Sequence, residues 1–222
     1  VEYPTTRALG ASPEERARDV NAALADPEIR ALMSTIGGDD QIRILRYLDP
    51  DLPLADPKPF FGYSDNTNLH SWLFAHGLAS FYGGSSMVHL GSGPTVDSEH
   101  VTSLRAALFG EGDLTYTLPA DSQDYGFDWS EERALTEASP REAAVPYEFY
   151  GPRTRIRGRT WGGCLEVLDQ LAWAHRLPDP FDLEGAILIF ETSEVLPSPD
   201  LVGRWIRGMG ERGYLEAAAG VL

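Results

Sequence analysis

The chain has 222 residues, with 18 basic against 34 acidic side chains, and its formal net charge at neutral pH is −16. Binding to nucleic-acid phosphates requires clustered cations, so this acidic balance excludes a general nucleic-acid binder. Hydrophobic residues make up 42% and charged residues 23% of the chain. These fractions are typical of a globular protein with a packed core and exclude a disordered chain.

Cys164 is the one cysteine of the chain, which excludes an internal disulfide framework and a zinc site built from paired cysteines. The apolar runs, such as residues 185–190, are far shorter than the ~20 residues of a membrane-spanning helix. We therefore expect a cytoplasmic protein without a membrane segment. The chain starts without Met and ends on the apolar residues 217–222, so we expect it to be a fragment cut at both ends.

The first third of the chain predicts repeated strand-turn-helix units. Ser12, Pro13 and Glu15 predict a capped helix that runs to about residue 24. A short helix that starts at 26–28, a buried strand at 31–36 and a helix at 39–48 are expected next. After a loop at 50–57, the pattern predicts a strand at 59–61 and a helix at 65–76. This order is typical of an α/β domain with a parallel sheet.

The middle of the chain, residues 81–159, is rich in Gly, Pro, Ser and acidic residues, with one predicted helix at 98–109. A loop of this length predicts a linker or a cover over a site. Regular structure returns with a helix at 165–174, a strand at 185–190 and a helix at 199–212. We expect an N-terminal domain at 1–90, a linker and cover region at 91–160 and a C-terminal domain at 161–222.

The clearest indication of a catalytic residue is the segment FFGYSDNT at residues 60–67, which contains Ser64. Here a predicted strand turns directly into a predicted helix. Such an elbow exposes a serine hydroxyl at the carboxyl edge of a sheet and at the N-terminus of a helix. Asn66 stands where the usual elbow has glycine, and asparagine tolerates left-handed backbone. The alternative is that Ser64 or Asp65 only caps the helix.

Gly37 and Gly38 form a second strand-to-helix turn, where the backbone could approach a ligand closely and donate amides to an oxyanion. A phosphate-binding loop is the rival interpretation. It is poorly supported, because no lysine follows the glycines and Asp39 and Asp40 would repel a phosphate.

Glu191 comes directly after an apolar strand, so it should lie with Ser64 outside the carboxyl ends of parallel strands. The pair predicts a nucleophile and an orienting acid. Glu194 is the less favoured acid because it lies further along the loop, and a structural hydrogen-bond role for Glu191 stays open.

Serine needs a base, normally histidine, to act as a nucleophile. His70 lies six residues after Ser64 on one helix and should point elsewhere. His76 and His175 lie near helix ends, where an imidazole commonly binds terminal carbonyls. His89 and His100, in the middle region, are the two that could reach Ser64, and no histidine follows Glu191.

Five blocks together resemble the LD-carboxypeptidase family of serine peptidases. They are GGDD, PKPFFGYSD, LASFYG, GGCL and LIFETSE, at residues 37–40, 57–65, 78–83, 162–165 and 188–194. This family includes muramoyltetrapeptide carboxypeptidases and microcin C self-immunity peptidases. The resemblance implies an α/β fold, with a flavodoxin-like parallel-sheet N-terminal domain and a smaller mixed, barrel-like C-terminal domain.

The resemblance assigns Ser64 as nucleophile, Glu191 as acid, and the amides of Asp65 and Gly38 as the oxyanion hole. It implies an acyl-enzyme on Ser64 and hydrolysis of an LD-type peptide bond near a free carboxylate, without metal or other cofactor. The family's histidine lies in a Gly-His-Thr block beyond Leu222, so we expect this fragment to lack its base.

The implied substrate is a muropeptide or a peptide-nucleotide conjugate, and the implied assembly is a homodimer. We expect Gly37 to line the substrate site, Arg159 to hold the terminal carboxylate and Trp129 to stack on a nucleobase. Arg159 ends a basic cluster at 153, 155, 157 and 159, which could instead protect an exposed strand edge. The other functions left open are a non-catalytic binding or immunity protein and an esterase.

Overall fold

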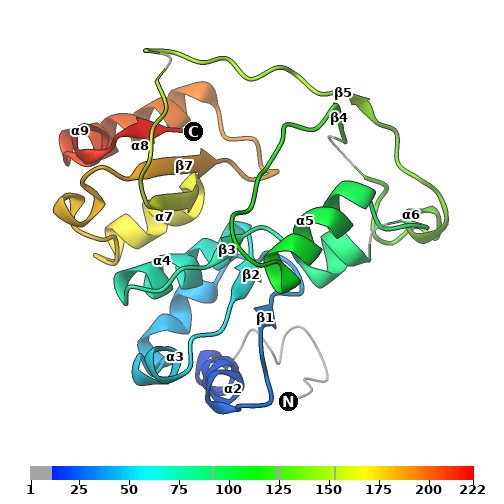
Figure 1. Ribbon diagram of the computed structural model, residues 1–222, viewed down its shortest axis with the longest axis horizontal. Coiled ribbons are helices and arrows are strands. Elements are labelled where there is room, and N and C mark those ends of the chain that lie inside the picture. The colour runs from blue at the N-terminus through cyan, green and yellow to red at the C-terminus, as the bar shows by residue number, and fades with distance from the viewer. Residues whose placement is uncertain (1–11, 92, 124–125, 153) are drawn as a thin grey trace.

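The computed structural model describes residues 12–91, 93–123, 126–152 and 154–222, and Figure 1 shows two α/β units joined by a long extended segment. The described helices are α2 (Pro13–Ala25), α3 (Asp51–Ala55), α4 (Thr67–Ala75), α5 (Ser98–Phe109), α6 (Arg133–Thr136), α7 (Leu165–Trp173), α8 (Pro199–Glu211) and α9 (Tyr214–Ala217). The strands are β1 (Leu32–Met33), β2 (Phe60–Gly62), β3 (Phe81–Tyr82), β4 (Asp121–Ser122), β5 (Glu142–Ala143), β6 (Thr160–Cys164), β7 (Ile187–Glu191) and β8 (Gly220–Val221).

The N-terminal unit is built on a parallel sheet with the strand order β1-β2-β3. Its central strand, β2, is buried on both faces, and Phe60 and Phe61 are 6% and 1% exposed. The Phe61 ring stacks on the ring of Phe81 in β3, with the centroids 4.7 Å apart. A short apolar run between a proline and a tight turn thus becomes a buried parallel strand, as the sequence predicts.

The C-terminal unit has a second parallel sheet with the order β6-β7-β8. Helix α7 follows β6 and helix α8 follows β7, and such crossovers return the chain to a parallel neighbour. The α/β class is confirmed. The expected mixed, barrel-like sheet differs from the described residues, in which all three strands are parallel and the sheet does not close.

Helix α4 joins the two units, because it packs against β6 and α7 of the C-terminal unit (Figure 1). Six of its nine residues are buried, including the polar side chains of Asn68 and His70. Its Leu69 and Leu73 belong to one continuous core cluster with Trp161 and Leu188. The hydrophobic core therefore crosses the junction between the two parallel sheets.

Helix α5 confirms the helix expected at 98–109, and α2, α4, α7 and α8 lie close to their expected positions. The predicted helix at 26–28 is a turn, in which the Asp26 carboxylate accepts the Glu28 N–H. The predicted loop at 50–57 contains α3, where Pro53 stands in the first turn and is tolerated. Ser12 adopts the cap position of α2 but its side chain makes no cap hydrogen bond.

The expected helix at 39–48 is two short 3-10 helices, Gln41–Arg43 and Leu45–Tyr47. The cause is a side chain from elsewhere in the chain. The Asp65 carboxylate accepts the backbone N–H groups of Asp40 and Gln41, each at 2.9 Å, and so fixes the start of this segment in a turn. Tertiary contact overrides the local helical spacing here.

The segment between α5 and β6 runs around the outside of the molecule (Figure 1). Its described residues carry only the small antiparallel pair β4-β5 and helix α6. Its large apolar side chains are mostly exposed, including Trp129 and Tyr147, each 56% exposed. The division of the chain at residues 90 and 160 stays a prediction. Along the described ranges, no helix combines the length and apolar character that crossing a bilayer requires.

Leu188 tests the importance of the central C-terminal strand. It has no exposed surface and lies in the shared core, so Leu188→Ala should lower the free energy of unfolding by about 2–5 kcal/mol. The matched variant Leu118→Ala, at a residue that is 60% exposed, should change stability by less than about 0.5 kcal/mol. Denaturant unfolding measures both, and equal losses would contradict the core assignment.

His70 makes stability depend on pH. Its Nδ1 lies 2.7 Å from Ser80 Oγ and its Nε2 2.9 Å from the Gly62 carbonyl, and burial lowers the pKa of the imidazole to about 4. Below an unfolded-state pKa of about 6.5, the unfolded chain binds the proton more readily. The resulting stability is present above pH 6.5 and is lost as the pH falls toward 4, by about 3 kcal/mol. Unfolding at pH 4.5 and 7.5 should show a smaller pH difference for His70→Asn, and an unchanged difference would refute this role.

Candidate active site

Ser64 lies at the junction of β2 and α4, on a left-handed backbone conformation with φ of +58°. A β-carbon makes this conformation unfavourable, so the turn stores strain of the kind found at functional sites. The side chain is half-buried, and its hydroxyl makes no hydrogen bond to any part of the chain that the structure describes. The capping alternative is therefore not what the structure shows for Ser64.

The Asp65 side chain holds the neighbouring loop rather than the helix. Besides the N–H groups of Asp40 and Gln41, it accepts a hydrogen bond from Asn68 Nδ2 at 2.8 Å. Burial raises the pKa of the Asp65 carboxyl, and the hydrogen bonds from the backbone N–H groups of Gln41 and Asp40 oppose that rise. The two amides that follow Asp39 are thus occupied by a buried carboxylate, whose charge would repel a phosphate bound beside it.

The two glycines of this loop let it close over the elbow. A β-carbon on Gly37 would lie 3.0 Å from Ser64 Cβ and 3.1 Å from Ser64 Oγ. On Gly38 it would lie 2.9 Å from the Asp65 carboxylate. Gly37 is thus beside Ser64, and Gly38 is beside the Asp65 side chain. The oxyanion hole formed by the amides of Gly38 and Asp65 stays a prediction.

Glu191 is the last residue of β7, at the carboxyl edge of the second sheet. Burial raises the pKa of its carboxyl, and the carboxylates of Glu166 and Glu194 raise it further. The hydroxyl of Tyr82 donates to Glu191 Oε1 at 2.5 Å and opposes this rise. Glu191 is half-buried whereas Glu194 is exposed, so the favoured acid is the one that lies inside the fold.

Tyr82 joins the two candidate catalytic residues. Its oxygen accepts the backbone N–H of Ser64 at 2.9 Å, and the same hydroxyl donates to Glu191. Thr67 Oγ1, in the first turn of α4, lies 3.4 Å from the Tyr82 oxygen and accepts the Cys164 N–H at 3.0 Å. One phenol group therefore bridges the elbow and the acid, which are far apart in the sequence.

Sequence reasoning missed Tyr82, Thr67 and Glu166. Glu166 accepts two hydrogen bonds from Ser193, one from the N–H and one from the hydroxyl, and so fixes the turn after Glu191. Tyr82 lies in the block at 78–83, which the resemblance included without a role. That block is the one sequence signal that pointed to it.

None of the five histidines bonds to Ser64 or Glu191. His70 is held by Ser80 and Gly62, and His76 Nδ1 binds the Trp72 carbonyl near the end of α4, as expected. His89 contacts Ser85 and the rings of Tyr63 and His100. Burial, together with His100, lowers the pKa of His89.

The residues expected to bind substrate are not all gathered at the elbow. Arg159 lies over the ring of Phe74 at 5.2 Å and lines a cavity of about 430 Å³ whose wall also includes Tyr82. Trp129 lies on the outer segment and is 56% exposed. Of the basic cluster, Arg153 lies outside the described residues and Arg155 and Arg157 are exposed.

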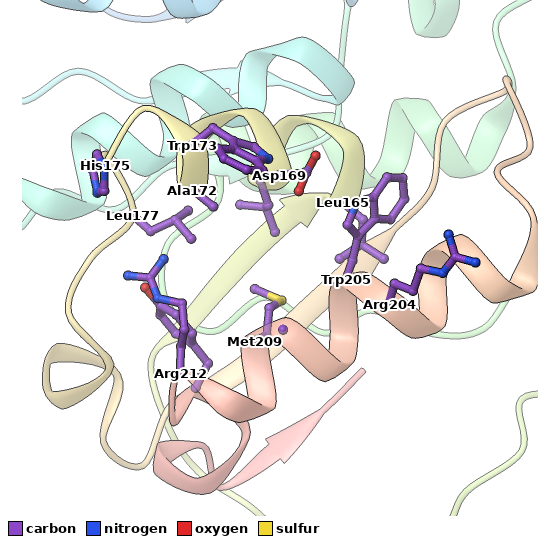
Figure 2. Close-up of a pocket in the computed structure, with 13 residues that line it drawn as sticks. Leu165, Asp169, Ala172, Trp173, His175, Leu177, Arg204, Trp205, Met209 and Arg212 are labelled. Atoms are coloured by element: carbon purple, nitrogen blue, oxygen red, sulfur yellow. The ribbon is translucent and has the colours of Figure 1, made fainter.

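A second cavity, of about 360 Å³, lies between α7 and α8 and contains no expected site residue. Figure 2 shows Trp173 and Asp169 on one side of it and Trp205, Met209 and Arg212 on the other. No group of three His, Cys, Asp or Glu side chains suited to a metal ion occurs in the part of the chain that the structure describes.

The chain is similar in sequence to known peptidases. Residues 2–83 match the LD-carboxypeptidase N-terminal domain and residues 157–222 match the LD-carboxypeptidase C-terminal domain. The microcin C7 self-immunity protein MccF of Escherichia coli is 34% identical over 81% of this chain and 52% of its own length. A probable murein peptide carboxypeptidase of Bacillus subtilis is 28% identical over 96% of this chain and 57% of its own.

Solved structures agree with these relatives. A structure of MccF in complex with glutamyl sulfamoyl guanosine has a TM-score of 0.81 at 29% identity, over 94% of this chain and 61% of that one. The muramoyltetrapeptide carboxypeptidase of Oxalobacter formigenes, at 22% identity and a TM-score of 0.70 over all of this chain and 65% of that one, shares the fold. The chain spans about half the length of the curated relatives. The chain belongs to the LD-carboxypeptidase family of serine peptidases, which are hydrolases.

Proposed function

We propose that the protein carrying this chain is a serine carboxypeptidase that hydrolyses an LD-type peptide bond near a free carboxylate. The observation that carries the proposal is the arrangement at the elbow. The Ser64 hydroxyl is free of hydrogen bonds to the described residues, and Tyr82 links the Ser64 backbone to the half-buried carboxylate of Glu191. Family membership supports the same class of reaction.

In this proposal Ser64 Oγ attacks the substrate carbonyl carbon and its proton passes to a general base. The amides of Asp65 and Gly38 bind the developing oxyanion. Collapse of the tetrahedral intermediate breaks the carbon–nitrogen bond, and the base returns the proton to the departing amine. Water then attacks the acyl-enzyme by the same route and releases Ser64. No step requires a metal or another cofactor.

Glu191 is proposed to orient and stabilise the base once the base carries the proton. The family resemblance assigns that base to the histidine of a Gly-His-Thr block later in the relatives' sequences. The five histidines of this chain support the assignment indirectly, because none of them makes a hydrogen bond to Ser64 or Glu191 within the described residues.

The proposed substrates are a muropeptide or a microcin C-like peptide-nucleotide conjugate. The names of two relatives, a probable murein peptide carboxypeptidase and a microcin C7 self-immunity protein, support these classes. Arg159 is proposed to bind the terminal carboxylate from the rim of the cavity that Tyr82 lines, and Gly37 to border the scissile bond. Trp129 is proposed to stack on a nucleobase. A role in peptidoglycan recycling, a cytoplasmic location and a homodimer complete the proposal.

Ser64→Ala in the full-length protein tests the nucleophile. The wild type should react with a fluorophosphonate probe and release the terminal amino acid from an LD-tetrapeptide or cleave a glutamyl sulfamoyl nucleoside. Ser64→Ala should lose labelling and at least about 10³-fold in kcat/KM. Ser103→Ala, at an exposed position on α5, is the matched control and should behave as the wild type.

The outcomes separate the candidate functions. A wild-type protein that binds these ligands without labelling or turnover would contradict the hydrolase and favour a binding or immunity protein. Cleavage of simple esters without cleavage of either peptide substrate would favour an esterase.

A further inference from the structure

The hydroxyl of Tyr82 lies where three structural elements meet. It contacts the Ser64 N–H of the elbow, Thr67 Oγ1 of α4 and Glu191 Oε1 of β7, at 2.9, 3.4 and 2.5 Å. Within the described residues, no other hydrogen-bonding group contacts both Ser64 and Glu191. Tyr82 is therefore the direct connection between the candidate nucleophile and the candidate acid.

The direction of each hydrogen bond follows from which groups carry protons. A backbone N–H only donates, so the phenol oxygen must accept from Ser64. Thr67 Oγ1 accepts the Cys164 N–H, which leaves its own proton for the phenol oxygen. The phenol has one proton, and the remaining partner is the Glu191 carboxylate. The hydrogen bonds from Cys164 to Thr67, from Thr67 to Tyr82 and from Tyr82 to Glu191 therefore all run toward the carboxylate. Hydrogen bonds aligned in this way strengthen one another.

The backbone is shaped to admit this network. Gly163 has a φ of +136°, and a β-carbon there would lie 2.5 Å from Thr67 Oγ1 and 3.0 Å from Tyr82 Cε2. A side chain at this position would separate the two sheets at the network. The strained Ser64 backbone also needs an acceptor for its N–H, and the phenol supplies it.

We propose that Tyr82 is a positioning residue that holds Glu191 Oε1 and anchors the Ser64 backbone, leaving the other carboxylate oxygen to orient the base. This inference rests on the proposed hydrolase function. It assigns Tyr82 no contact with the reacting atoms, and its effect passes through Glu191 and the elbow.

The electrostatics agree with this geometry. Burial and the neighbouring Glu191 raise the pKa of Tyr82 above its ordinary value, so the phenol keeps the proton that it donates. Four groups face Glu191. The Tyr82 hydroxyl donates to it, the Glu166 and Glu194 carboxylates repel its charge, and the Cys164 thiol beside it donates to Glu166 Oε2 at 3.2 Å. Loss of the phenol removes a donor that keeps Glu191 ionised, so the pKa of Glu191 should rise further.

Tyr82→Phe in the full-length protein is the test. Loss of a hydrogen bond to a charged group predicts a fall in kcat of about 10- to 100-fold with little change in KM. The acid limb of the pH profile of kcat/KM should move to higher pH. Tyr116→Phe, at a tyrosine that is 67% exposed, is the matched control and should leave both unchanged.

A double-mutant cycle separates positioning from a merely structural role. The fluorophosphonate labelling rate is measured for Tyr82→Phe, Glu191→Ala and the combined variant. If Tyr82 acts through Glu191, its loss should matter much less once Glu191 is absent. Additive losses would show that Tyr82 acts independently of Glu191 and would overturn the proposal.

Replacement of Tyr82 by 3,5-difluorotyrosine keeps the hydroxyl and guards against a folding defect in the Phe variant. Its phenol still carries a proton to donate to Glu191, so kcat and the pH profile should stay close to those of the wild type. A kcat as low as that of Tyr82→Phe in the difluorotyrosine variant, or a wild-type kcat and pH profile for Tyr82→Phe, would refute the positioning role if Ser64→Ala is inactive. Activity of Ser64→Ala would instead refute the proposed hydrolase, and this inference with it.

Discussion

The hydrogen bond from the Cys164 N–H to Thr67 Oγ1 ties the first turn of α4 to the end of β6, across 97 positions of sequence. Thr67 has no exposed surface, and Cys164 is 1% exposed. A buried N–H that lacks an acceptor is costly, so this contact sets how closely the two parallel sheets approach. The carboxyl edges of β2 and β7 meet at this junction, and the candidate active site lies there.

In proteins with open parallel sheets, functional groups generally lie just outside the carboxyl ends of the strands. Here two sheets contribute one such end each, with Ser64 after β2 and Glu191 at the end of β7. The shared core that includes Leu69, Trp161 and Leu188 makes this junction a packed interface. The geometry between nucleophile and acid is thus held by burial as well as by hydrogen bonds.

The polar side chains around the elbow hydrogen-bond to the neighbouring backbone and side chains, and they leave the Ser64 hydroxyl without a partner among the described residues. The Asp65 carboxylate is committed to the 40–41 amides and His70 to Gly62 and Ser80, whereas the Ser64 hydroxyl is bonded to no described residue. A backbone held in place by its neighbours can sustain the left-handed Ser64 conformation. The site is preorganised by side chains that take no part in the proposed chemistry.

The sequence by itself determined the α/β class, the strands around 60 and 188, and the helices α2, α4, α5, α7 and α8. It also singled out Ser64 and Glu191 as candidate site residues. These features follow from periodicity and strand-to-helix turns, which are local signals. Only the tertiary structure decided that residues 39–48 form 3-10 turns, since the Asp65 carboxylate captures their amides. It also decided that the C-terminal sheet is parallel throughout and that Tyr82 links the elbow to the acid. Such contacts join residues 18 and 109 positions apart, and they depend on how two sheets pack, which no local spacing encodes.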